Sequence, residues 1–184
     1  MNAIRYLLMA LCLAVPGWGW EFTYSATTLG AGPTWNRPVE NLSGLSGLGT
    51  NVRYSVQSFV APVTGSYTLI STATPTWDNF LVLYQGAFNA AAPLANAIAA
   101  NDDYPTFGII GESRIVHTLT AGLTYNIVTT GYVNASVGAF TNVISTPTPE
   151  PATWLMISFG VGVLLIRRRL SPDRSKTTEP ARPA

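Results

Sequence analysis

The residues of this chain with the clearest capacity for chemistry are three aspartates, Asp78, Asp102 and Asp103. Asn79 follows the first aspartate, and Asn101 precedes the other two. Carboxylate and amide oxygens are the hard ligands that Ca²⁺ takes in proteins, and a bound cation would relieve the repulsion between clustered acids. These residues are therefore candidate ligands of a calcium site. The interpretation that the sequence favours is that these side chains only cap their own turns by bonding to nearby backbone groups.

Support for a catalytic site is thin. The single histidine, His117, would have to serve any Ser-His-Asp triad, yet it alternates with Ile115 and Leu119 on an apolar strand face. The chain has no Gly-x-Ser-x-Gly motif, and its single cysteine excludes a disulfide scaffold and a cysteine-based zinc site. We expect a non-catalytic protein. The alternative is a small secreted hydrolase acting on polysaccharide, which would need titratable groups converging in one pocket.

A second kind of ligand is suggested by aromatic residues near the same turns. Trp35, Trp77, Tyr104 and Phe107 could form a stacking patch for an extracellular polysaccharide. The alternative is that they are core residues or loop anchors, the commoner role of large aromatics.

The elements that must position these residues are β-strands. Residues 20–146 contain six short runs rich in Val, Ile, Thr, Tyr and Phe at roughly ten-residue spacing, which is typical of a β-sandwich. We predict an all-β fold, a single jelly-roll-like sandwich, with a loop at 42–50 and an Ala-rich connection over Ala87–Ala100. The predicted strands are Val52–Val60, Gly65–Thr72, Phe80–Tyr84, Glu112–Thr120, Leu123–Thr130 and Val137–Ile144.

The charge of this region limits its partners. Residues 20–146 hold three arginines and six acidic residues, a net charge of −3. Nucleic-acid binding needs a basic face, so we expect no nucleic-acid partner.

The N-terminus is typical of a secretory signal peptide. Arg5 precedes an apolar run of about ten residues, and small residues stand at Gly17 and Gly19. The run is shorter than the roughly 20 residues that span a bilayer. We predict a signal peptide over residues 1–19 and therefore an exported protein, with no cysteine left after cleavage because Cys12 lies inside it.

The C-terminus predicts a membrane-associated helix. An apolar run over residues 152–166 is followed by a basic stop, and residues 170–184 form a polar tail that we expect to be disordered. A helix of this length covers roughly 22 Å, so interfacial residues must make up part of a bilayer core of about 30 Å. The basic stop places the tail in the cytoplasm before processing. Its residues are Arg167, Arg168 and Arg169.

The residues in front of this helix make the segment more specific. Pro149, Glu150 and Pro151, a short Gly-containing apolar helix and the basic stop closely resemble the PEP-CTERM sorting signal over residues 147–169. The resemblance implies processing by an exosortase, a membrane protease-transpeptidase, and location at the cell surface. The tail of residues 170–184 departs from the pattern, because such signals usually end soon after the basic cluster. A plain C-terminal anchor is the alternative.

The middle of the chain carries five short motifs: Gly65-Ser-Tyr67, Trp77-Asp78-Asn79-Phe80, Asn101-Asp102-Asp103, Leu119-Thr-Ala-Gly122 and Gly138-Ala-Phe140. With them, residues 65–144 resemble the bacterial pre-peptidase C-terminal domain and its CUB-like relatives. The resemblance implies a secreted, non-catalytic β-sandwich for binding or spacing, in which the aspartate-bearing turns lie close enough to hold calcium. We therefore expect an exported bacterial cell-surface or extracellular-matrix protein.

Overall fold

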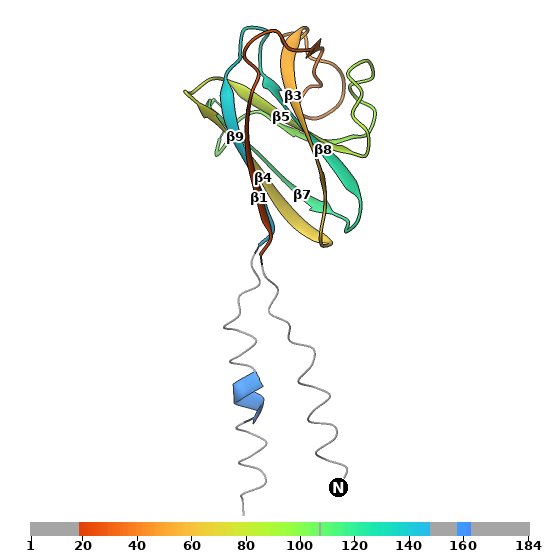
Figure 1. Cartoon of the computed structure of the whole chain (residues 1–184), viewed down its shortest axis with the longest axis vertical. Helices are drawn as coiled ribbons and strands as arrows, with labels where there is room; N and C mark the ends of the chain where they lie inside the picture. Colours follow the sequence, from red (N-terminus) through yellow and green to blue (C-terminus); the bar gives the residue numbers. More distant parts are fainter. Residues whose placement is uncertain (1–18, 107, 148–157, 163–184) are drawn as a thin grey trace, which may run out of the picture. The chain divides into compact units, whose positions relative to one another are not determined.

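The computed structural model describes residues 19–106, 108–147 and 158–162. Nine strands within the first two ranges build two antiparallel sheets, which face each other in Figure 1. One sheet has the order β1-β9-β4-β7 and the other β2-β3-β8-β5-β6. The strands are β1 (Glu21–Thr27), β2 (Thr34–Trp35), β3 (Val52–Val60), β4 (Gly65–Thr74), β5 (Asn79–Gln85), β6 (Ala97–Asn101), β7 (Glu112–Leu119), β8 (Thr124–Gly131) and β9 (Ala139–Ser145).

The connectivity is that of a jelly roll. Apart from the β2–β3 and β5–β6 connections, each successive strand lies in the opposite sheet. This double-sheet arrangement is one way in which antiparallel proteins limit exposed strand edges. The predicted all-β sandwich is confirmed.

The predicted strands match six of the observed ones, and β3 has the predicted bounds. The prediction of an Ala-rich connection was wrong at its C-terminal end, because residues 97–101 form β6. Alanine has low strand propensity, so the pattern carried no signal. Pairing with β5, for example Val82 opposite Ala100, makes this segment a strand. Strands β1 and β2 were also not predicted.

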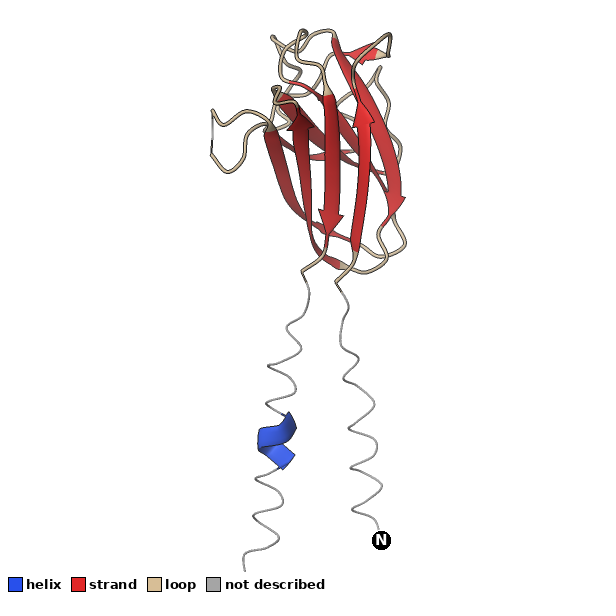
Figure 2. Cartoon of the chain, turned by 60° about the vertical axis from the view of Figure 1, so that its left-hand side comes forward, coloured by secondary structure: helices blue, strands red, loops and turns tan. Residues whose placement is uncertain are grey.

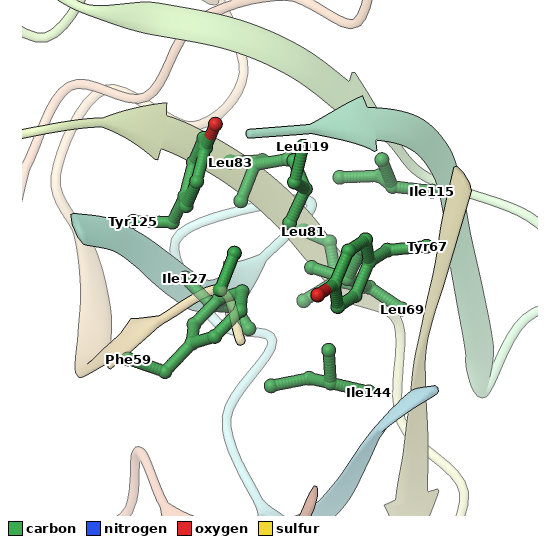
Figure 3. Close-up of a cluster of buried hydrophobic side chains, with 11 residues drawn as sticks. Phe59, Tyr67, Leu69, Leu81, Leu83, Ile115, Leu119, Tyr125, Ile127 and Ile144 are labelled. Atoms are coloured by element: carbon green, nitrogen blue, oxygen red, sulfur yellow. The ribbon is translucent and has the colours of Figure 1, made fainter. Parts of the chain in front are cut away.

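The main hydrophobic core lies between the two sheets (Figure 3). Tyr67 and Leu69 of β4 meet Leu81 and Leu83 of β5, and all four are at most 1% exposed. Strand side chains alternate between the two faces, which is why Tyr67 and Leu69 lie on the same, inward face of β4. This core fixes the separation of the sheets and therefore the position of their ends.

A second core covers the outer face of the five-stranded sheet. Phe80, Val82 and Tyr84 of β5 pack there with Trp35 of β2 and the side chain of Phe88. Strand β5 is therefore buried on both faces, as its continuous apolar run predicted. Loops, rather than a third sheet, supply this outer cover.

The chain enters and leaves the sandwich at the same end. Glu21 of β1 pairs with Ser145 of β9, and the Trp20 N–H donates to Thr146 Oγ1 at 2.9 Å. Strand β5 begins at the opposite end, because Asn79 Nδ2 donates to the Ser71 carbonyl near the end of β4, where Thr72 pairs with Glu112. Strand β6, which pairs with β5 in the antiparallel direction, ends there too. Loops gather at both ends of the sandwich in Figure 2.

Several predicted segments lie outside the described residues. These are the signal peptide except Gly19, the Pro149–Pro151 motif, the basic stop and the polar tail. Residues 158–162 are helical and fall within the helix predicted over residues 152–166. Among the helical residues that the structure describes, none form a helix long and apolar enough to cross a membrane.

Candidate metal centre

The antiparallel pairing of β5 and β6 brings the three predicted aspartates together. Asp78 directly precedes β5, Asp102 and Asp103 directly follow β6, and Leu81 pairs with Asn101. One carboxylate oxygen from each aspartate lies within 4.8 Å of the other two. Two oxygens bound to one Ca²⁺ can be up to about 5 Å apart, twice the usual 2.3–2.6 Å bond. All three members of this aspartate cluster (Asp78, Asp102 and Asp103) can therefore reach one calcium ion.

Asp102 is the buried member of the cluster. Its side chain is 8% exposed, and its Oδ1 atom is buried with no hydrogen-bond partner among the described residues. Burial, and then the negative charges of Asp78 and Asp103, raise the pKa of Asp102 from 3.8 to about 7. An ionised carboxylate is costly in such a place unless a cation compensates it.

The other two aspartates differ from Asp102 in their surroundings. Burial, followed by the charge of Asp103, raises the pKa of Asp78. Oδ2 of Asp103 accepts a hydrogen bond from the Gly108 N–H. Turn capping therefore accounts for one oxygen of Asp103, Oδ2, which accepts a backbone hydrogen bond. It does not account for the buried Oδ1 of Asp102, which has no hydrogen-bond partner among the described residues.

The two neighbouring asparagines make hydrogen bonds to other parts of the sandwich. Asn79 is 1% exposed, and its Nδ2 donates to the Ser71 carbonyl between the sheets. Asn101 donates from Nδ2 to Glu40 Oε1 and accepts from the Arg114 N–H at Oδ1. Both amide atoms of Asn101 are therefore used to hold strands and loops in place. Oδ1 of Asn79, in contrast, is buried with no hydrogen-bond partner among the described residues, as is Oδ1 of Asp102.

Arg37 is a charged neighbour of the cluster that sequence reasoning missed. Its side chain is 2% exposed, and its guanidinium lies 4.0 Å from the centre of the Phe80 ring and 4.7 Å from that of Tyr132. Nε and Nη2 donate to the Tyr132 carbonyl at 3.1 and 2.8 Å, and Nη1 donates to the Pro38 carbonyl at 2.9 Å. The cation is thus bound to main-chain oxygens near the cluster.

The charges around the cluster favour a divalent ion. Burial lowers the pKa of Arg37, whereas Asp102 and Asp78 act in the opposite direction. Glu40 adds a further negative charge that acts on Asp102. With the three aspartates and Glu40 ionised, these groups and the Arg37 guanidinium carry a net charge of −3, which one divalent cation would reduce to −1. The sequence feature that could have pointed to Arg37 is the Gly-rich loop after it. A Cβ atom at Gly49 would lie 2.7 Å from Arg37 Nε, so the buried arginine side chain needs a glycine at this position.

A shallow cleft of about 660 Å³ lies beside β6. Val39 and Ala100 supply its apolar lining, and Glu40, Asn41 and Ser43 supply polar groups. Ala100 stands two residues before Asp102, a distance of about 7 Å along a strand. A carboxylate, an amide and a hydroxyl can exchange hydrogen bonds with a hydroxyl-bearing ligand.

The structure separates the histidine from the aspartate cluster. His117 shares a face of β7 with the buried Ile115 and Leu119, as predicted, and pairs with Tyr67 of β4. It lies four residues, or about 13 Å, along β7 from Ser113, whose hydroxyl bonds the Asp102 carbonyl. The imidazole therefore does not share a pocket with the aspartates.

The described aromatic residues of the candidate stacking patch have their own contacts within the sandwich. Trp35 is 4% exposed, and its Nε1 donates to Thr130 Oγ1 in the outer core. Trp77 donates from Nε1 to the Ala139 carbonyl, and the Tyr104 ring packs under the guanidinium of Arg114. Phe107 lies outside the described residues. Trp35 therefore has the core role that the sequence analysis gave as the commoner one, because β2 carries this side chain into the core.

Comparisons with known proteins find no matching family model and no matching curated protein. Solved structures that are similar to this chain include the pre-peptidase C-terminal domain of collagenase from Bacillus anthracis, at 10% identity and a TM-score of 0.42, covering 67% of this chain and 88% of that one. The K1 cleaved adhesin domain of Lys-gingipain from Porphyromonas gingivalis has 13% identity, a TM-score of 0.38 and coverage of 72% and 99%. A family 35 carbohydrate binding module from an environmental isolate has 16% identity, a TM-score of 0.35 and coverage of 70% and 93%.

Proposed function

We propose that this protein is an exported, non-catalytic β-sandwich module that binds calcium and serves a binding or structural role at the bacterial cell surface or in the extracellular matrix. The observation that carries the calcium assignment is the buried Oδ1 of Asp102, which has no hydrogen-bond partner among the described residues. One carboxylate oxygen of Asp102 lies within 4.8 Å of one oxygen from each of the other two aspartates. The excess of negative charge around the cluster, where Glu40 adds to the three aspartates and Arg37 is the cation, supports a divalent ion.

The non-catalytic role is supported by the same geometry. Glycosidases hold two carboxyl groups roughly 5–9.5 Å apart, so that a sugar and a water fit between them. The oxygens of the aspartate cluster all lie within 4.8 Å of one another, which suits one shared ion better. A hydroxyl-bearing ligand would bind in the cleft beside β6, where the polar side chains of the lining can form hydrogen bonds with it.

The calcium assignment predicts a metal-dependent melting temperature. In the full-length protein, calcium at a hundredfold excess over its Kd should stabilise the fold by about 2.7 kcal/mol relative to chelator. Asp102→Asn should abolish this shift, because it removes the charge of the buried ligand. Scanning calorimetry with calcium and with chelator checks this.

The matched control is Glu112→Gln, an acid at the same end of the sandwich that is not part of the cluster. It should keep the calcium shift. Equal melting temperatures of the wild type in calcium and in chelator would contradict the assignment. Without calcium, Asp102→Asn should be at least as stable as the wild type, because no buried charge remains to be compensated.

We also propose that the C-terminal segment directs sorting by an exosortase. Pro149, Glu150 and Pro151 followed by an apolar run and three arginines support this proposal. In a plain anchor the helix is retained, and its membrane insertion would depend on hydrophobicity alone. Because Glu150 lies outside the apolar run, its replacement should barely change insertion.

Glu150→Ala is therefore expected to block processing in the native host. Immunoblots of cell fractions should show an unprocessed protein held in the membrane, whereas the wild type is shortened and reaches the surface. Wild-type size and location in the variant would leave the plain anchor as the better explanation. Thr153→Ala, a substitution near the motif that leaves the tripeptide intact, is the control and should be processed normally.

A further inference from the structure

The first residues of β7 hold the aspartate-bearing segments in place. Ser113 is fully buried, and its Oγ lies within hydrogen-bond distance of two carbonyls, that of Asn79 at 2.9 Å and that of Asp102, which share its one hydroxyl proton. Asn79 follows Asp78 directly. One hydroxyl therefore joins the start of β5, which carries one predicted ligand, to the end of β6, which carries the other two.

Two further hydrogen bonds surround this contact. The Tyr104 N–H donates to the Glu112 carbonyl at 2.9 Å, and the Arg114 N–H donates to Asn101 Oδ1 at 2.8 Å. The residues on either side of Asp102 and Asp103 are thus bonded to the residues on either side of Ser113. The segment that supplies two carboxylates is held at three points by one strand of the opposite sheet.

From these contacts we propose that Ser113 is a positioning residue that sets the spacing of the aspartate cluster and makes the site selective for calcium over magnesium. The proposal rests on the proposed calcium binding. Mg²⁺ requires bonds of 2.0–2.1 Å, so two oxygens bound to it lie at most about 4.2 Å apart, against about 5 Å for Ca²⁺. The oxygens of the cluster all lie within 4.8 Å of one another, a limit that is inside the span of Ca²⁺ and wider than that of Mg²⁺.

The register of the four-stranded sheet supplies a matched control. Ser71 of β4 pairs directly with Ser113 and is equally buried. Its Oγ has no hydrogen-bond partner among the described residues. Ser71→Ala and Ser113→Ala therefore remove the same group from the same layer of the sandwich, but only the second removes contacts to the aspartate-bearing segments.

The experiment is titration calorimetry of the full-length protein in mild detergent with calcium alone and with magnesium alone. Changes to groups that orient metal ligands commonly lower affinity by about 10–100-fold. Ser113→Ala should lose at least about tenfold in calcium affinity and much less in magnesium affinity, so that the selectivity falls. Ser71→Ala should stay within about twofold of wild type for both ions, and Ser113→Thr, which restores the hydroxyl, should recover calcium affinity.

The outcomes separate the two proposals. If the wild type binds calcium and Ser113→Ala has the same calcium affinity and the same selectivity over magnesium, the positioning role of Ser113 is overturned and the proposed function is not. Absence of calcium binding by the wild type would overturn the proposed function and this inference with it. If Ser113→Ala does not fold, Asn101→Ala removes the neighbouring bond to the Arg114 N–H. That variant should also lose selectivity, and unchanged selectivity would count against the proposal.

Discussion

Arg37→Met is expected to destabilise the sandwich by about 3–5 kcal/mol in the absence of calcium, the usual cost of removing one partner from a buried set of charges. The guanidinium is 2% exposed and is the cation that most offsets the raised pKa of Asp102. Methionine fills similar space but leaves the carbonyls of Tyr132 and Pro38 without their donors. Urea unfolding in chelator measures the loss.

Calcium should restore part of this stability, because the ion supplies positive charge where the arginine no longer does. The calcium-induced increase in the free energy of unfolding should therefore be larger in Arg37→Met than in the wild type. Arg53→Met is the control, since this half-buried arginine of β3 makes none of these contacts, and it should change stability by less than about 1 kcal/mol. An equal loss in the two variants would show that Arg37 has no special electrostatic role.

The stability of the calcium-free protein is expected to fall as the pH rises from about 4 to about 7. The folded state raises the pKa of Asp102 from 3.8 to about 7, so over this interval the folded chain binds its proton more tightly than the unfolded chain. The free energy of unfolding then decreases with pH, by at most about 1.4 kcal/mol per pH unit for one proton. The raised pKa of Asp78 acts in the same direction.

Urea unfolding in calcium-depleted buffer at several pH values across this interval tests the sign. Asp102→Asn should remove most of the slope, because asparagine does not titrate. Saturating calcium should also flatten or reverse the slope in the wild type, since metal ligands bind in their deprotonated form. Stability that rises with pH in the calcium-free wild type would contradict the assignment of Asp102 as a buried acid.

Local pattern was enough to predict most of the strands. Alternating side chains in Gly65–Thr72 and the apolar run Phe80–Tyr84 were read correctly because a strand that buries one face or both must display that pattern in its own residues. Segment Ala97–Asn101 could not be read in this way. It is a strand because β5 offers it hydrogen-bond partners, and its alanines carry no preference of their own.

The candidate site also has a part that the sequence predicts and a part that only the fold decides. The sequence by itself determined the ligand types, since aspartates beside turn residues already indicate a hard-cation site or turn caps. Only the tertiary structure decided that Asp78 and Asp102 meet, because the hairpin of β5 and β6 brings together residues 24 positions apart in the chain. It also decided that Arg37 and Ser113 belong beside them. These two residues come from a loop and from the opposite sheet, and nothing in their local sequence records the long-range packing of the two sheets that places them there.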